Sequence, residues 1–269
     1  MMSQLVTLPG LELQSILIYL LSLFLASLRM GAFLVASPFF GSRMVPLPVR
    51  IVFSVALGLG ALDYVSFPSI ELLTSVIIVP IIFQEIALGL TCGVILNMCF
   101  STVILAGEKI AASSGLAFAS QVDPANGAQS PVISQIFSLF LLVLFFSLNG
   151  HLVIFELLYQ SYETFPLGSL NDVNKLFELG IEASSTIYEQ AVLIVLPIVS
   201  LLFLMNLGIG YITKSAPQLN LFSFGFPLTI LGTFFALYFS VDALQFVFSD
   251  LIDRSLNFVR LVLAGGNDG

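Results

Sequence analysis

Four long stretches of the sequence carry no charged residue: 86–107, 124–155, 190–213 and 215–241. A helix that crosses a lipid bilayer needs about 20 mostly apolar residues. Each stretch is long enough, although 124–155 opens with polar residues. Only 9% of the chain is charged and 58% is hydrophobic, whereas roughly a quarter of a soluble domain is charged. The sequence therefore predicts a polytopic membrane protein and excludes a soluble enzyme, a disordered tail and a disulfide scaffold.

The apolar pattern predicts roughly six to seven helical segments and an all-α membrane protein of one domain. These segments are approximately 12–37, 45–67, 71–106, 131–160, 187–212 and 221–260. The segment 71–106 is either one helix or two, because Pro80 and Glu85 interrupt it. A proline inside a membrane helix is tolerated where neighbouring helices bind the freed backbone groups.

Among the ionisable residues inside these segments, Arg29, Glu85 and His151 are the candidates for buried or functional groups. A charge at the bilayer centre costs several kcal/mol unless it is paired, hydrated or packed against protein. Arg29 and Glu85 therefore lie either at membrane interfaces or on helices that protein covers. His151 follows Asn149-Gly150 and is either a proton-relay group or a histidine at a helix end or kink that bonds to the backbone. No second titratable residue follows it at helical spacing until Glu156.

Motifs for catalysis and metal binding do not occur in the sequence. There is one histidine, and Cys92 and Cys99 are not spaced as a metal site, so we expect no enzyme activity, no cofactor and two packing thiols. The net charge of −8 argues against nucleic-acid binding, which needs a basic surface. Gly89 and Gly93 form a G-x-x-x-G step, which allows close approach of two helices.

Two polar stretches separate apolar segments. Residues 107–124 are rich in small residues and end in the turn signal Asp123-Pro124. A loop at membrane depth must be buried in protein or line a cavity; the alternative is a helix end followed by a turn. Residues 214–220 join the last two apolar segments into a hairpin, in which Pro217 ends a helix. Gln218 and Asn220 can bind the freed backbone groups there.

These motifs, in this order, resemble the FliR family of flagellar biosynthetic proteins. The residues that carry the resemblance are Arg29, Pro38, Pro46–Arg50, Gly107-Glu108, Gly115, Asp123-Pro124, Pro131–Ile133, Asn149–His151, Ser161-Tyr162, Pro166–Gly168, Ala216–Asn220 and Gly225–Pro227. The resemblance covers nearly the whole chain. The T component of virulence type III secretion injectisomes is similar and is the alternative. Lys214 stands where the family often has Arg, so a bidentate contact by that Arg does not carry over.

The resemblance implies a subunit of the type III export gate in the bacterial inner membrane, at the flagellar basal body. It implies P and Q components as partners around one copy of this chain, the B component as a cytoplasmic contact, and unfolded flagellar proteins in transit. Residues 1–180 would be P-like, and 181–269 would form a Q-like hairpin. Part of the assembly would lie on the periplasmic side, where helices pack on subunits rather than on lipid.

The resemblance also implies that a loop within 111–124 plugs the closed pore. The centre of this loop is Ser114, Gly115, Leu116, Ala117 and Phe118. Small residues fit a narrow lumen, and Gly115 adds conformational freedom. Leu116 and Phe118 supply apolar surface, and hydrophobic constrictions gate by dewetting.

Two other functions compete with a protein-conducting pore. A secondary transporter or ion channel for small solutes would use His151, Glu85 or Arg29 as a relay. Many transporters show paired halves with matched broken helices, and we find no such internal repeat in this sequence. An intramembrane enzyme would need a catalytic constellation, which is missing.

Overall fold

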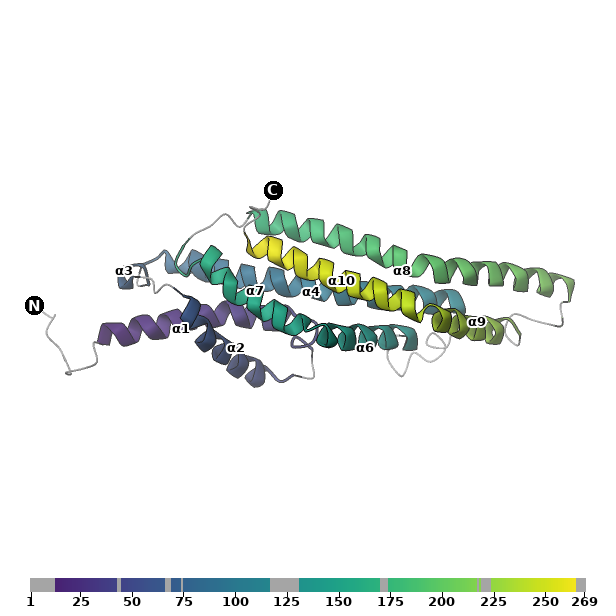
Figure 1. The fold of residues 1–269 in the computed structure, drawn as a ribbon, viewed down its shortest axis with the longest axis horizontal. Helices are drawn as coiled ribbons and strands as arrows, with labels where there is room; N and C mark the ends of the chain where they lie inside the picture. Colours follow the sequence, from purple (N-terminus) through teal and green to yellow (C-terminus); the bar gives the residue numbers. More distant parts are fainter. Residues whose placement is uncertain are drawn as a thin grey trace, which may run out of the picture. The chain divides into compact units, whose positions relative to one another are not determined.

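Helices form all the regular structure that the computed structural model describes (Figure 1). It describes residues 13–42, 45–65, 69–73, 75–116, 131–169, 174–216, 218 and 224–264. The helices are α1 (Leu13–Ala36), α2 (Leu47–Ala61) with a 3-10 turn (Leu62–Tyr64), α3 (Ile70–Leu73), α4 (Ile78–Ser114), α6 (Val132–Ser147), α7 (Gly150–Thr164), α8 (Asn174–Ser215), α9 (Phe226–Phe239) and α10 (Val241–Leu263). The prediction of an all-α membrane protein is confirmed.

Helix α4 settles the question of whether the segment 71–106 is one helix or two. The short α3 precedes it, and α4 then runs without interruption from Ile78 to Ser114. Pro80 lies in the first turn, where the missing N–H has no intrahelical partner to lose. Glu85 lies one turn further on and does not break the helix.

Two predicted apolar segments each consist of two helices that meet at a bend in the structure. The segment 131–160 divides into α6 and α7 beside Asn149, whose φ of 57° is left-handed. The segment 221–260 divides at Ser240 into α9 and α10, which meet at a bend of 66°. Four described helices are long and apolar enough to cross a membrane, and the number rises to six if each interrupted pair is one span.

The chain forms two compact units that interleave in the sequence. The first comprises Met1–Asn97, Leu152–Ala183 and Leu256–Gly269, and the second comprises Met98–His151 and Ser184–Ser255. The division into a P-like part and a Q-like hairpin rests on resemblance and stays a prediction.

Small residues bring α4 against α1 in the first unit. A Cβ on Gly89 would lie 2.2 Å from the backbone oxygen of Arg29, and one on Gly93 would lie 2.6 Å from the Cβ of Ala36. Real Cβ atoms do not come this close, so only glycine fits. The close approach predicted from the G-x-x-x-G step is therefore confirmed.

A second small-residue contact joins α1 to α2 in the same unit. A Cβ on Gly58 would lie 2.5 Å from the hydroxyl of Ser27. Beside it, the Phe155 ring of α7 packs edge-on against Phe33 and Phe53, at centroid distances of 5.9 and 6.1 Å. Cys92 is fully buried in this unit, as expected for a packing thiol.

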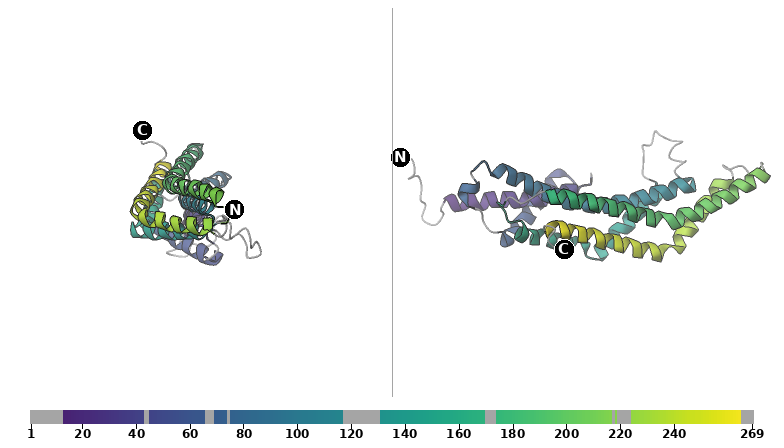
Figure 2. Two further views of the ribbon diagram at one scale, coloured as in Figure 1. Left: turned by 90° about the vertical axis from the view of Figure 1, so that its right-hand side faces the viewer. Right: turned by 90° about the horizontal axis from the view of Figure 1, so that it is seen from above.

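The second unit contains the C-terminal part of α4, together with α6, most of α8, α9 and most of α10. A Cβ on Gly107 would lie 2.6 Å from the Cα of Ser134, so α4 and α6 also meet through small residues. Helices α8 and α9 form the two antiparallel arms of a hairpin (Figure 2), and Gly232 of α9 packs on Met205 of α8. Cys99 is fully buried, with Sγ 3.9 Å from the Leu251 carbonyl oxygen.

Candidate functional site

A buried ion pair lies in the first unit. Arg29 Nε donates to Glu85 Oε2 at 2.7 Å, and Arg29 Nη2 donates to Glu85 Oε1 at 2.9 Å. Neither side chain has any exposed surface. The close helix approach at Gly89, one turn after Glu85, brings the carboxylate of α4 within reach of α1. Of the two alternatives for these charges, the structure favours helices covered by protein, and this chain itself covers them.

Helix α7 completes the surroundings of the guanidinium. Arg29 Nη1 donates to Ser161 Oγ at 2.8 Å, and Nη2 also donates to the carbonyl oxygen of Phe165 at 2.8 Å. The Tyr162 ring lies 4.0 Å from Arg29 Cζ, and its hydroxyl donates to the carbonyl of Ala26 at 2.9 Å. Four of the five guanidinium N–H groups are therefore bonded. An ion pair with this many bonds links α1 and α4 to the end of α7 and is poorly suited to a proton relay.

His151 lies at the kink that the sequence allowed. It occupies the first turn of α7, directly after the left-handed Asn149. Its ring packs on Phe146 of α6, with centroids 4.9 Å apart. Its Nδ1 is buried and has no hydrogen-bond partner among the described residues, so the expected backbone bond is not made by that atom.

The base of the predicted plug loop is anchored to the C-terminal hairpin in the second unit. Helix α4 ends at Ser114, and Gly115 follows in the left-handed region with φ of 81°. Thr229 Oγ1 of α9 lies 2.9 Å from the carbonyl oxygen of Ser114. Asn206 Nδ2 of α8 donates to the carbonyl oxygen of Ser113 at 3.1 Å. The residues before the loop are thus held by both arms of the hairpin.

Only part of the predicted loop and turns falls within the described residues. Ser114 is buried, its hydroxyl donates to the carbonyl of Ala111, and Leu116 is half-buried. Gln218 is exposed in a turn. The predicted residues that lie outside the described part are Ala117, Phe118, Asp123, Pro124, Pro217 and Asn220.

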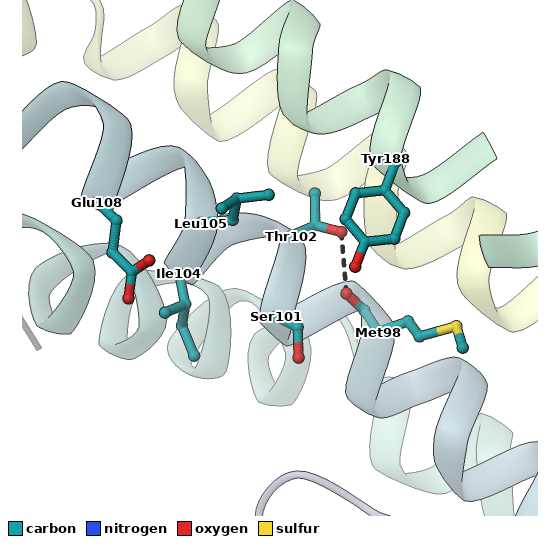
Figure 3. Close-up of a pocket in the computed structure, with 7 residues that line it drawn as sticks. All are labelled: Met98, Ser101, Thr102, Ile104, Leu105, Glu108 and Tyr188. Carbon is teal, nitrogen blue, oxygen red and sulfur yellow. Dashed lines mark hydrogen bonds between the residues drawn. The ribbon is translucent and has the colours of Figure 1, made fainter. Parts of the chain in front are cut away.

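A cavity of about 270 Å³ lies between α4 and α8 in the second unit (Figure 3). Glu108, the exposed residue of the predicted Gly107-Glu108 motif, lines one end, whereas Gly107 is buried against α6. Tyr188 of α8 lies across from Thr102, whose hydroxyl donates to the Met98 carbonyl at 2.9 Å. Within the described residues, no three His, Cys, Asp or Glu side chains are grouped to hold a metal ion.

Asn206 and Thr229, which bond to the end of α4, were not among the predicted site residues. A signal for Asn206 was available, because an amide stands out in the uncharged stretch 190–213. Thr229 and Thr233 are both fully buried and one turn apart. Nothing in the sequence distinguishes the one that contacts α4.

Several helices of bilayer length and apolar composition, together with a buried ion pair between them, are typical of a polytopic α-helical membrane protein. Residues 20–255 match the family of bacterial export proteins, family 1, and the chain therefore belongs to that family. The expectation of a FliR-type protein-export component is confirmed.

Three relatives illustrate the breadth of this similarity. The flagellar biosynthetic protein FliR of Escherichia coli (strain K12) is 34% identical over 76% of this chain and 77% of its own length. FliR of Bacillus subtilis (strain 168) is 30% identical over 89% of this chain and 93% of its own length. The surface presentation of antigens protein SpaR of Shigella flexneri is 28% identical over 87% of this chain and 90% of its own length.

Proposed function

We propose that this chain is the R-type subunit of a flagellar type III export gate. With the P and Q components it forms a pore that conducts unfolded flagellar proteins across the inner membrane at the basal body. The B component contacts this gate from the cytoplasmic side, and one copy of the chain serves each gate. Family membership supports this function, as do the relatives named FliR. The role is conduction rather than catalysis.

The second part of the proposal is that the loop within 111–124, which begins in the last turn of α4, plugs the closed pore. The observation that carries it is the anchored end of α4. Ser113 and Ser114 are bonded to α8 and α9, and Gly115 then turns the chain out of the helix in a conformation that L side chains rarely adopt. A loop that emerges from a fixed base can be held in a narrow lumen.

Deleting Ser114–Phe118 tests the plug. The variant is produced with the P and Q components, and ion leakage is measured in cells that are not exporting. We expect higher leakage through an assembled gate. A matched pair of variants separates loss of apolar surface from loss of length: Leu116→Ser with Phe118→Ser should leak, whereas Leu116→Ile with Phe118→Leu should not. Unchanged leakage in the deletion variant would contradict the plug.

The injectisome alternative is tested by deleting the gene. We expect loss of flagella and motility, because no flagellar subunit would be exported. Normal secretion of virulence effectors in the same strain supports the flagellar function. Intact motility with lost effector secretion would assign the chain to an injectisome. A small-solute transporter is disfavoured by the bonding of Arg29 and Glu85, which leaves no free relay group at that place.

A further inference from the structure

One face of α4 remains open in the second unit, between the helices that cover its other sides. Ser101, Ile104 and Glu108 form this open face, since residues three, four and seven apart share one side of a helix. Ser101 and Glu108 are exposed, and Ile104 is half-buried. Helix α6 packs on one side of α4 at Gly107, and α8 lies on the other side, bonded through Asn206. The described residues of the unit therefore leave the open face uncovered.

Polar groups border the open face on both sides. A cavity of about 270 Å³ lies between it and α8, and one of about 310 Å³ lies between it and α6, with Ile104 lining both. Figure 3 shows Glu108 at one end of the first cavity and Tyr188 further along it. Gln135 and Ser138 line the second cavity. The neighbouring surface of α8 is apolar, with three side chains that are more than half exposed: Val192, Leu193 and Leu196.

Glu108 has no counter-ion among the residues that the structure describes. The next residue, Lys109, lines a neighbouring groove of about 340 Å³ against α8. Helix α8 carries no charge from 190 to 213, and Asn206 of this stretch bonds to the carbonyl of Ser113, five residues after Glu108. Glu108 therefore lies beside the apolar stretch of α8 and not beyond its end. A carboxylate in such surroundings costs several kcal/mol unless it is paired or hydrated.

The first unit shows how this chain accommodates an acid in an apolar helix. Glu85 accepts two hydrogen bonds from Arg29, and both side chains are fully buried. An ionised carboxylate only accepts hydrogen bonds, so the group that matches Glu108 is a cationic donor. Hydrocarbon tails of lipid offer no such donor. Serines such as Ser101 and Ser138 are, in addition, typical of surfaces where two membrane helices pack together.

We infer that the open face of α4 binds a membrane helix of a partner subunit, which brings a Lys or Arg side chain to Glu108. The inference rests on the proposed function, because it takes the partner from the P and Q components of the gate. The exposed carboxylate and the two cavities beside it then form an intermolecular counterpart of the Arg29–Glu85 pair.

A photo-reactive benzoyl-phenylalanine in place of Ser101 identifies what covers the open face. The full chain is purified in complex with the P and Q components and irradiated, and the cross-linked peptide is sequenced by mass spectrometry. We expect an apolar helix of a partner subunit with a Lys or Arg within one turn of the cross-linked residue. A cross-link to phospholipid alone, to a helix without a basic residue, or to nothing would overturn the inference.

Glu108→Gln tests the charge itself, since it keeps the shape of the side chain. The amount of partner subunits that co-purify with the chain should fall at least about tenfold, while the amount of the chain in the membrane stays normal. Glu108→Asp keeps the charge and should retain the partners. The matched control is Asp253→Asn, which removes an exposed carboxylate from α10 in the same unit and should retain them as well.

Charge reversal adds a test that loss of structure cannot imitate. Glu108→Lys should lose the partners, and changing the basic residue found by cross-linking to Glu should restore them. If the unchanged chain does not co-purify with the P and Q components, the proposed function itself fails. If the unchanged chain does co-purify, and Glu108→Gln retains as much partner as Asp253→Asn, the inference alone is overturned.

Discussion

Arg29 and Glu85 form a two-point ion pair between α1 and α4, with N–O distances of 2.7 and 2.9 Å and no exposed surface on either side chain. Removing one partner leaves a buried charge without its counter-ion. We therefore expect Glu85→Met or Arg29→Met to lower the free energy of unfolding by about 3–5 kcal/mol. Thermal unfolding of the purified complex and the amount of protein in the membrane measure this effect.

Replacing both partners gives the internal control for the ion pair. The variant with Arg29→Met and Glu85→Met should be more stable than either single variant, because no unpaired charge remains. Asp250→Asn removes an exposed pair with Arg254, whose side chains are 37% and 47% exposed. It should cost less than about 0.5 kcal/mol. Additive losses in the double variant would contradict coupling of the two charges.

Gly89 fixes the distance between α1 and α4, so an added methyl group should separate them. Its Cβ would meet the Arg29 backbone oxygen at 2.2 Å, and backbone cannot move aside as a side chain can. We expect Gly89→Ala to destabilise the protein by about 1–3 kcal/mol. Gly208→Ala is the control, since nothing lies within 4 Å of its Cβ position in α8. It should be neutral or stabilising by up to about 1 kcal/mol.

Tyr162 stabilises the surroundings of the Arg29 guanidinium in two separate ways, through its ring and through its hydroxyl. Tyr162→Phe keeps a ring over Arg29 and removes the 2.9 Å bond to the Ala26 carbonyl. A loss of about 1 kcal/mol is expected. Tyr159→Phe removes a longer bond, 3.4 Å, to the Leu57 carbonyl in a partly exposed position, and should cost less. Equal losses in the two variants, measured by thermal unfolding, would show that the length and burial of the bond do not matter here.

His151 packs through its ring rather than through Nδ1. Because that atom has no partner among the described residues, His151→Gln should export flagellar subunits at the normal rate. Export of a reporter substrate and co-purification of the gate subunits measure the result. A variant that assembled normally and yet stopped transport would restore the proton-relay hypothesis.

The sequence predicted helices better than it predicted their interruptions. The charge-free stretch 86–107 sufficed for the middle of α4, because length and apolar content depend on local composition, whereas Pro80 and Glu85 left its start open. The break at Asn149 had a local signal in Asn149-Gly150, which allowed a kink there, whereas the break at Ser240 had none. Ser240 is an ordinary polar residue in an apolar segment, so the 66° bend between α9 and α10 could not be predicted from it.

The partners of the functional residues could not be predicted in the same way. Arg29 and Glu85 stood out as unfavourable in lipid, but 56 positions separate them in the chain, and helical spacing carries no information over that range. Gly89 came closest to indicating the pairing, because it marks the place where another helix packs. The contact of Thr229 could not be predicted, because it depends on which face of α9 packs against the end of α4.

Because both cysteines are buried, the native chain can be used directly for labelling at single introduced cysteines. Cys92 and Cys99 are the only two thiols in the sequence, and neither has exposed surface. A single cysteine introduced at an exposed position, such as Gln218 at the hairpin tip, would therefore be the one site that a water-soluble maleimide reaches in the folded protein. Accessibility and cross-linking can be mapped position by position without first replacing either native residue.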